Sequence, residues 1–546
     1  MFIRVKKKPN GKRSVQVVES YRRADKVNQK IIRHVGQGIT DKEVEELKKI
    51  ADSIIIETKN NRQPVLPFIK PEDIYSTLKK LPTKDLVNIS DLKEEQRVID
   101  GFNEVLGKLY SDLNLDTVIK RTKKNRQWND ILKTLAIARV ANPESKKRTS
   151  SFLEQDYGIK LPLEKIYRTM DHVFECEDII KKRIAETTLS LFNDKVDILF
   201  FDVTTLYFES FASDGLREFG FSKDCKFKET QVVLALITTT NGLPITYKLF
   251  PGNMYEGHTL IEMIEELKKT YRVSDIVLVA DRAMFTSGNL ELMDSQGIRY
   301  IVSARLKTMS NELKEEILGS EYKATVINNE LNWFKELSHK GRRLIVSYST
   351  NRAKKDLKDR QRLIERLMRK VKDKKIKISD MIPNYGTKKY IKINNQTAEI
   401  NESKISDDAR WDGLHGIITN SKEENVEVLL SRYRDLWQIE EAFRVNKHDL
   451  KMRPVYHWTQ NRIRAHISIC FLAYTLVKQA IHRIKIQYKP MSFEQIRNEL
   501  AHAQSSILLD TSTKKRYCIT SHVTINQKKI YQVFGLKRSN VPFEII

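Results

Sequence analysis

The sequence predicts a multidomain α/β protein whose central part is a mixed sheet flanked by helices. Three observations predict it. The chain has 546 residues, more than a single hydrophobic core accommodates. Apolar β-branched runs and amphipathic runs follow one another in the order β-β-β-α-β-α-β between residues 196 and 304. Segments of different character, helical or strongly basic, lie on both sides of that region.

The overall charge predicts a polyanionic partner. Lys and Arg total 97 while Asp and Glu total 71, so the formal net charge is +26. Phosphates release counterions when Lys and Arg neutralise them, so double-stranded DNA fits this charge better than a membrane surface does. We therefore expect DNA as the main partner.

Several classes of protein are disfavoured. No apolar run approaches the roughly 20 residues of a membrane-spanning helix, and the basic start Met1–Lys8 has no apolar stretch behind it. We expect no membrane partner and a cytoplasmic protein associated with the bacterial nucleoid. The cysteines lie far apart and form no CxxC pair, so we expect neither a zinc site nor a disulfide framework.

Residues 1–70 are predicted to form a basic N-terminal module containing a β-hairpin. Two alternating strands, Phe2–Val5 and Ser14–Val18, flank the turn signal Pro9–Gly11. Residues 1–35 contain 11 Lys and Arg, so this module either contacts DNA phosphates or presents a solvated basic face.

Residues 71–190 are predicted to form a helical domain. In Trp128–Val140 the apolar residues recur at three and four positions until Asn142 and Pro143 stop the pattern. We expect this domain to bind DNA, although no helix-turn-helix signature marks it and packing accounts for most of its helices.

Residues 191–305 are predicted to form the first part of the central sheet. The turn Thr240–Gly242 joins the second and third strands as a hairpin, so three successive strands should pair antiparallel. The expected elements are strands over Val196–Leu206, Gln231–Ile237, Pro244–Phe250, Ile276–Ala280 and Tyr300–Ala304, and helices over His258–Tyr271 and Ser287–Gln296.

The rest of the chain is predicted to contain a β-rich basic insertion at 306–430, the second part of the core at 431–490 and a C-terminal segment at 491–546. The insertion surrounds a basic helix, Asp359–Lys370. Lys and Arg are dense from Arg352 to Lys377, which fits a solvated face and a DNA-contacting face about equally well.

Two aspartates stand out in the predicted sheet. Asp202 interrupts an apolar strand and Asp281 directly follows another. A single Asp at a strand end is often only a cap for the next turn. In this strand order, however, the first and fourth strands can be neighbours, and both carboxylates would then lie at one end of the sheet. With a third acid they would suit Mg²⁺, which prefers oxygen ligands, and phosphodiester chemistry.

The third acid is expected on a long helix from about Ser431 to Lys447. Tyr433, Glu440 and Lys447 are seven residues apart, so in a continuous helix they would project from one face. Glu440 is preferred over its neighbour Glu441 because only Glu440 has this spacing. The alternative is an amphipathic helix whose charged face meets solvent.

Residues 190–485 resemble the insertion-sequence DDE transposases, in particular the group with a Tyr-Arg-Glu-Lys signature helix and a β-rich insertion before the final Glu. The basic N-terminal hairpin and Arg453–Val455 are also similar to this group. The segments that carry the resemblance are Phe201–Thr205, Pro251–Asn253, Ala280–Phe285 and Trp437–Arg444.

The resemblance implies an RNase H-like core in which Asp202, Asp281 and Glu440 bind two Mg²⁺ ions, with Mn²⁺ as a substitute. It implies that Tyr433 and Lys447 contact backbone phosphate near the transposon end. One position departs from the signature, because Leu436 stands where the Arg is expected. Its phosphate contact is then absent, or supplied by Arg434 or Arg444.

The sequence thus predicts a transposase that binds inverted-repeat ends as at least a homodimer, cleaves them and joins the 3′-OH ends to target DNA. Two alternatives remain. One is a nuclease with the same core that does not transpose, and the other is a domesticated or inactive DNA-binding protein.

Overall fold

The structure is a computed structural model, and the contacts within the chain divide it into two compact units. Unit 1 comprises residues 1–109, 151–160 and 480–546, and unit 2 comprises residues 110–150 and 161–479. The described residues are 2–7, 13–23, 26–38, 87–119, 126–191, 198–209, 211–220, 228–271, 277–281, 287–327, 330–372, 389–394 and 397–545, with single residues between 41 and 55.

The N-terminal module is a three-stranded antiparallel sheet. The predicted hairpin is present as β1 (Phe2–Lys7) paired with β2 (Arg13–Arg23), and β3 (Lys26–Gly38) adds a third strand on the other side of β2. The turn Pro9–Gly11 lies outside the described residues. The residues Ser14–Val18 of β2 are all buried, and Val15 and Val17 belong to a small hydrophobic core.

Unit 1 contains a second sheet that joins distant parts of the sequence. Its strands are β4 (Leu92–Ile99), β16 (Gln504–Asp510), β17 (Arg516–Thr520) and β18 (Phe543–Ile545), in the order β18-β17-β16-β4. The prediction that residues 71–190 are helical throughout is therefore wrong at β4, which pairs with β16 more than 400 positions away. Residues 71–86 lie outside the described part.

The other helices of residues 87–190 agree with the predicted pattern. α3 (Arg126–Ala141) includes the segment Trp128–Val140 and ends before Asn142 and Pro143. The remaining helices in this region are α2 (Gly101–Asp112), α4 (Lys146–Tyr157), α5 (Leu163–Glu175) and α6 (Glu177–Ser190).

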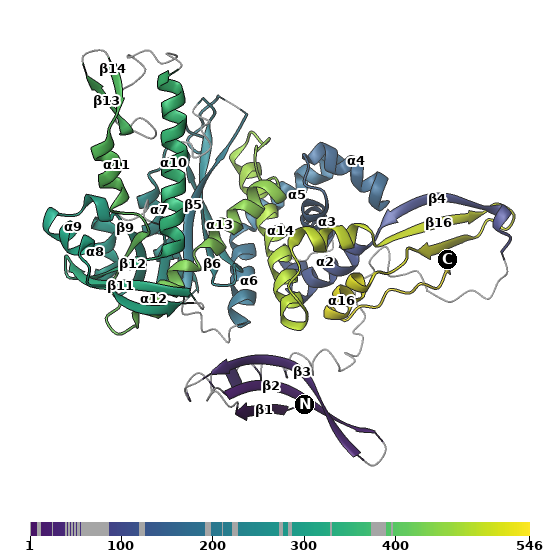
Figure 1. Cartoon of the computed structure of the whole chain (residues 1–546). Coiled ribbons are helices and arrows are strands. Elements are labelled where there is room, and N and C mark those ends of the chain that lie inside the picture. The colour runs from purple at the N-terminus through teal and green to yellow at the C-terminus, as the bar shows by residue number, and fades with distance from the viewer. Residues whose placement is uncertain are drawn as a thin grey trace. The chain divides into compact units, whose positions relative to one another are not determined.

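Unit 2 is built on a mixed nine-stranded sheet with the order β10-β11-β12-β15-β9-β8-β5-β6-β7 (Figure 1). The first three core strands pair antiparallel, as predicted, and β5 also pairs in parallel with β8. The core strands are β5 (Ile198–Tyr207), β6 (Gln231–Thr239), β7 (Pro244–Pro251), β8 (Val277–Ala280) and β9 (Arg299–Ala304).

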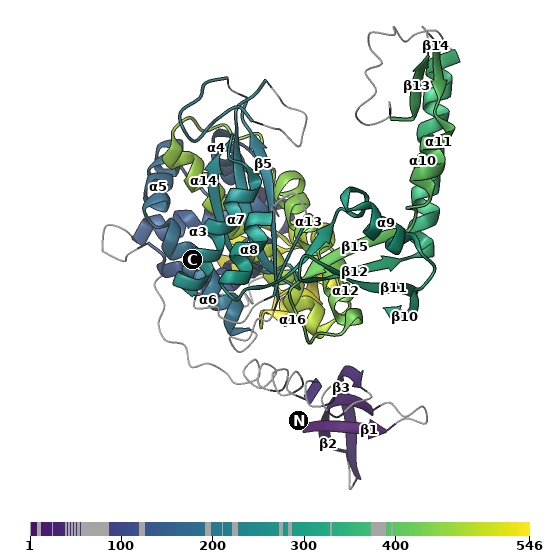
Figure 2. The same ribbon diagram turned by 90° about the vertical axis from the view of Figure 1, so that its left-hand side faces the viewer.

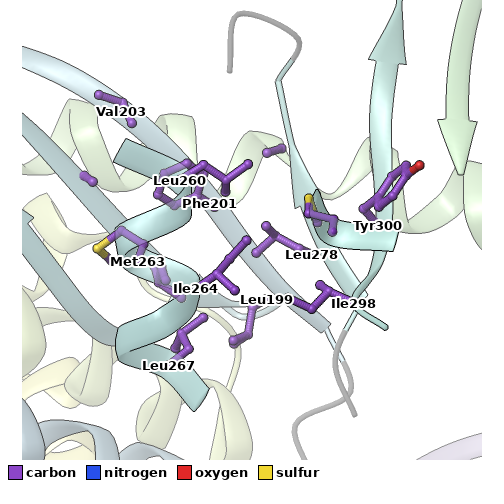
Figure 3. Packing of buried hydrophobic residues seen from close by; sticks show 14 of the residues in the cluster. Leu199, Phe201, Val203, Leu260, Met263, Ile264, Leu267, Leu278, Ile298 and Tyr300 are labelled. Atoms are coloured by element: carbon purple, nitrogen blue, oxygen red, sulfur yellow. The ribbon is translucent and has the colours of Figure 1, made fainter. Parts of the chain in front are cut away.

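The hydrophobic core of unit 2 lies between this sheet and α7 (Glu256–Tyr271), with α8 (Ser287–Ser295) beside it. Figure 3 shows Leu260, Met263, Ile264 and Leu267 of α7 facing Leu199, Phe201 and Leu278 of the sheet. Apolar residues at three- and four-residue intervals give α7 this buried stripe.

The predicted insertion extends the same sheet. Its strands β10 (Lys323–Ile327), β11 (Glu330–His339), β12 (Arg342–Tyr348) and β15 (Leu414–Thr419) continue the sheet beyond β9, with α9 (Asn311–Leu318) beside them. Helices α10 (Thr350–Lys372) and α11 (Glu402–Ala409) project from it and carry the hairpin of β13 (Ile391–Asn394) and β14 (Thr397–Ile400), as Figure 2 shows.

The last part of the chain, from Val426 onward, contains several helices. α12 (Val426–Arg434), α13 (Trp437–Arg444) and a π-helical segment, Val445–Asp449, precede α14 (Gln460–Gln487). After α14 come α15 (Phe493–Ala501) and α16 (Ile525–Val533), each with a capping box at its N-terminus. Among the described residues we find no helix that combines the length and apolar character of a membrane span.

Candidate active site

Asp202 and Asp281 occupy equivalent positions on neighbouring strands. β5 and β8 run parallel, and the last residues of their ladder are Phe201 and Ala280, so each aspartate is the next residue on its strand. The predicted neighbourhood of the first and fourth strands is thus confirmed. Asp202 is half-buried and its Oδ1 accepts a hydrogen bond from the Val203 amide at 2.7 Å, whereas Asp281 is exposed.

The helix predicted over Ser431–Lys447 is interrupted. α12 ends at Arg434, α13 begins at Trp437, and the chain is π-helical from Val445. The prediction of one continuous helix is therefore wrong, and seven-residue spacing alone cannot align Tyr433, Glu440 and Lys447 on one face. The two turns that such a face requires are not continuous here.

Tyr433 and Glu440 nevertheless line one groove together with Asp281. This groove has a volume of about 970 Å³. The part of the chain that follows β9, the start of α10, and helices α12 and α13 all contribute to its wall. Its lining includes the cationic residues Arg305, Lys307, Arg352, Lys355 and Arg434. A groove with both cations and carboxylates suits a phosphodiester together with metal ions.

The pKa of Tyr433 is affected by both Asp281 and Glu440. Burial raises the pKa of its phenol, a hydrogen bond with Ser303 opposes this, and the charges of Asp281 and Glu440 raise the pKa further. Its ring lies 4.9 Å from that of His415. Burial lowers the pKa of His415 to about 4, with repulsion from Arg352, so this imidazole is neutral at neutral pH.

Glu440 and Glu441 point to different surroundings. Glu440 is exposed and lines the groove. Glu441 accepts a hydrogen bond from the buried Lys478 at 3.2 Å and lies 3.8 Å from Arg444. A carboxylate already held by a buried ammonium is less available to a metal ion, so the surroundings favour Glu440.

The remaining predicted DNA contacts differ in position. Arg434 lines the groove and donates to Asn332 at 2.6 Å. Arg444 is directed to Asp449 at 3.3 Å and is not part of the groove lining, and neither is Lys447. Of the two candidates to replace the signature Arg, Arg434 is thus the one beside the acids. Leu436 is buried and also borders the groove.

The side chains at this place have the type of ligand atom that a divalent metal ion prefers, but they are not already grouped around a metal position. Carboxylate oxygens are the ligands that Mg²⁺ prefers. Asp281 and Glu440 carry such oxygens in the lining of the groove, and Asp202 carries them on the neighbouring strand. Within the ranges that the structure describes, no three His, Cys, Asp or Glu side chains are grouped closely enough to hold an ion. The motif residues Arg282–Phe285, directly after Asp281, lie outside those ranges.

Several groove residues were not singled out from the sequence. Arg352 and Lys355 lie at the start of α10, inside the basic run for which solvation and DNA contact were equally good explanations. His415 and the half-exposed Trp437 also line the groove. Trp437 opens the segment Trp437–Arg444 that carries the resemblance, but nothing in its spacing distinguishes it from a core aromatic.

The turn Pro251–Asn253, one of the segments that carry the resemblance, has contacts that indicate a structural role. The Gly252 amide donates to the Leu216 carbonyl at 3.1 Å, and its carbonyl accepts from Gln231 Nε2 at 2.9 Å. A Cβ on Gly252 would lie within 3.0 Å of the backbone of Gln231 and Glu218. Asn253 is exposed.

Comparisons with known proteins identify the family. A search among curated proteins finds no match. A solved structure described as a piggyBac transposase synaptic complex with hairpin DNA is similar at 10% identity and a TM-score of 0.38, over 74% of this chain and 77% of that one. The N-terminal domain of the IS1634 family transposases matches residues 3–64, and the transposase DDE domain matches residues 195–476, more than half of the 546 residues. The chain therefore belongs to the DDE transposases of insertion sequences, enzymes that cleave DNA and transfer its strands.

Proposed function

We propose that the core of unit 2 is RNase H-like and that Asp202, Asp281 and Glu440 together hold two divalent metal ions, Mg²⁺ with Mn²⁺ as a substitute. The observation that carries the proposal is the equivalent position of the two aspartates on the parallel pair β5 and β8. Glu440 borders the same groove as Asp281, which supports its role as the third ligand.

The metal ions, when bound, would activate the attacking oxygen and stabilise the leaving oxygen of a phosphodiester. The chain's own residues would hold and orient the DNA. Tyr433 and Arg434 border the groove and are suited to contact the phosphates on either side of the reacting one. We propose Lys447 and Arg444 as phosphate contacts farther along the strand.

The remaining cations of the groove neutralise charge that the acids and the DNA bring together. Arg305, Lys307, Arg352 and Lys355 are distributed around its lining. In the absence of such cations, three carboxylates and a phosphate would repel one another strongly. This arrangement supports binding of the inverted-repeat ends at the nucleoid, hydrolysis of one strand and transfer of the resulting 3′-OH to target DNA.

Pairing of two transposon ends implies at least two active sites, and we propose that a homodimer provides them. A dimer with twofold symmetry would present the same surface of each copy to the other and would bring both ends together in one complex.

Cleavage of labelled DNA that carries the element's own end tests the proposal. Glu440→Gln is compared with its matched neighbour Glu441→Gln, and Asp281→Asn is included. We expect Glu440→Gln and Asp281→Asn to bind the DNA and to lose cleavage, because each removes a metal ligand charge, while Glu441→Gln still cuts. Removal of metal with a chelator should abolish cutting, and added Mg²⁺ or Mn²⁺ should restore it.

Loss of cleavage in Glu441→Gln alone would contradict the assignment of Glu440. A wild-type protein that binds the end and cuts in no divalent ion would favour the DNA-binding alternative. Cutting without joining to target DNA, under conditions in which both ends are present, would favour the nuclease alternative.

A further inference from the structure

Unit 2 contains a second cationic cavity that the DDE site does not use. It has a volume of about 230 Å³ and lies where the loop before α4 meets the segment that follows the π-helix. We call it the Lys146 pocket. Its charged lining consists of Arg139, Lys146, Lys147, Lys451 and Arg453 against a single carboxylate, Glu144.

Lys146 is the central feature of this pocket. Its side chain is only 5% exposed, and no hydrogen bond or ion pair to it is found among the residues that the structure describes. Burial, together with repulsion from Arg139, lowers its pKa to about 7. A buried ammonium without an acidic partner is costly in free energy, so its retention in the pocket needs a reason.

The other polar groups leave the charge of Lys146 uncompensated. Glu144 is engaged by Lys451 at 3.3 Å. Arg139 is also buried, and its Nη1 donates at the limiting distance of 3.5 Å to the Leu450 carbonyl. Burial lowers the pKa of His457 to about 3, so this imidazole is neutral and cannot compensate the charge of Lys146.

The backbone adds a further preference for an anion. Lys146 is the first residue of α4, whose 12 residues align their peptide dipoles, and Ser145 caps the helix by accepting from the Arg148 amide at 3.3 Å. The positive end of the helix therefore faces the same cavity as the buried ammonium. Helix N-termini bind phosphate and carboxylate groups through such amides.

Exposed aromatic side chains border the pocket. Tyr456 is 58% exposed and belongs to its lining, and Trp458, two residues later, is 65% exposed. The Trp458 ring lies 5.6 Å from the guanidinium of Arg217. Exposed rings beside a cationic surface are the combination with which proteins hold nucleic acid, because bases stack on the rings while cations follow the phosphates.

We propose that the Lys146 pocket binds a phosphate group of the DNA backbone, away from the reacting phosphate. The proposal rests on the DNA transposase function and adds a contact point to it. Lys146 and the first amides of α4 would contact the phosphate oxygens, with Arg139 and Lys451 behind them. A single phosphate fits the cavity volume and matches the excess of cations.

The pocket is fixed to the strand that carries Asp202. The Val455 amide donates to the Tyr207 carbonyl at 3.3 Å, and Phe208 pairs with Val455. Tyr207 lies five positions after Asp202 on β5, which corresponds to about 17 Å at the usual rise of a strand. One bound DNA end would therefore meet the pocket and the proposed metal ligands on the same strand of unit 2.

DNA binding across a salt series tests the proposal. Lys146→Met removes the charge and keeps the length, Lys146→Arg keeps the charge, and Lys165→Met removes a charge from an exposed position of α5 as the matched control. We expect Lys146→Met to bind the transposon end about tenfold more weakly and to lower the slope of log affinity against log salt by about 1. Lys146→Arg should largely restore both values.

Thermal unfolding without DNA distinguishes a lysine that binds DNA from one that only stabilises the fold. Because Lys146 is buried without a partner, Lys146→Met should raise the unfolding temperature while it weakens DNA binding. A lower unfolding temperature together with unchanged DNA binding would overturn the proposal. Thermal unfolding in the presence of inorganic phosphate distinguishes a DNA phosphate from free phosphate as the ligand. If inorganic phosphate stabilises the wild type but not Lys146→Met, and the two proteins bind DNA with equal affinity, the pocket is a site for free phosphate and the proposal fails.

Cleavage by the wild type in Mg²⁺ is recorded in the same preparation. If the wild type cuts the end and Lys146→Met binds it with unchanged affinity and salt slope, the pocket proposal fails and the proposed function stands. If the wild type neither binds nor cuts, the proposed function fails first.

Discussion

Acidification should destabilise unit 2 through the buried His457. This side chain is 9% exposed, and burial followed by repulsion from Lys146, Arg139 and Arg462 lowers its pKa from 6.5 to about 3. The aromatic rings of Tyr167 and His466 lie beside it, at 6.3 Å and 5.3 Å. No acidic group opposes the repulsion in this lowering of the pKa.

The sign and size of the effect follow from proton linkage. The folded pKa is lower than the unfolded pKa, so the unfolded chain takes up a proton that the folded chain does not, and stability falls as the pH falls through 6.5. At about pH 5 the unfolded imidazole is protonated and the folded one is still neutral. The difference of 1.5 pH units below the unfolded pKa corresponds to about 2 kcal/mol. This value depends little on the folded pKa, provided that it stays well below 5.

The measurement compares wild type with His457→Gln, in which a neutral side chain of similar length does not titrate. Urea unfolding followed by tryptophan fluorescence is suitable, because all 5 tryptophans lie in residues 128–458 and so report on unit 2. Between about pH 7 and pH 5 the wild type should lose about 2 kcal/mol more stability than the variant. Histidines that do not contact His457 contribute equally to both proteins and cancel. The neighbouring His466 is held neutral by its own burial, which lowers its pKa well below 6.5.

An equal loss in the two proteins would refute the reasoning. It would mean that His457 takes up its proton in the folded state, and therefore that the pocket is either open to water or already neutralised by an anion. If the expected difference is observed, the same unfolding measurement in the presence of transposon-end DNA should reduce it, because a bound phosphate favours the protonated imidazole.

Two further substitutions test the packing that positions the site. Gly252→Ala should destabilise unit 2 by more than about 2 kcal/mol in the same unfolding experiment, because the new Cβ would clash with backbone atoms of Gln231 and Glu218. An effect within experimental error would contradict this expectation and show that the turn adapts. Leu278→Ala, in the buried strand before Asp281, should lower the free energy of unfolding by about 3 kcal/mol and impair cleavage. The control Val428→Ala, at a 41% exposed position of α12, should change it by less than about 0.5 kcal/mol, and equal effects of the two substitutions would contradict the burial of β8.

The parts of the fold that the sequence predicts well are those with strong local patterns. β5 and β8 are short apolar runs, and Asn241-Gly242 marks the hairpin between β6 and β7, so pairing and the two aspartates could be predicted together. α3 has a regular apolar stripe, and its bounds agree with the predicted segment Trp128–Val140 to within a few residues. In each case the information lies within a window of about 20 residues.

The parts that were missed depend on distant contacts. β4 alternates weakly, with polar Lys93–Arg97 in its middle, and it becomes a strand because β16 offers it a partner from the other end of the chain. The strands of the insertion likewise join the core sheet through β15 and β9. Lys146 has no distinctive pattern at all, because its isolation arises only when the loop before α4 meets residues 451–457.

The interruption between α12 and α13 has a physical origin in the sheet beneath them. No Gly or Pro occurs from Val426 to Arg444, so local propensity favours one continuous helix there. α12 packs against β8, β9 and β10, whereas α13 packs against β5 and β6 and buries Ile439, Ala442 and Phe443. Neighbouring strands rotate by about 20–25° relative to one another, so a straight helix cannot follow both parts of the sheet.

This interruption also determines which residues reach the groove. Tyr433 is the penultimate residue of α12 and shares a hydrogen bond with Ser303 of β9. Glu440 lies on α13, which packs on the strand that carries Asp202. In a single straight helix the two side chains would differ in direction by only about 20°. Two helices can instead adjust independently to their strands, so the phenol can hold its place beside Asp281 while Glu440 moves with α13. A substitution that rejoins the helices, such as Asp435→Ala with its higher helix propensity, should therefore disturb the position of Glu440 before it disturbs that of Tyr433.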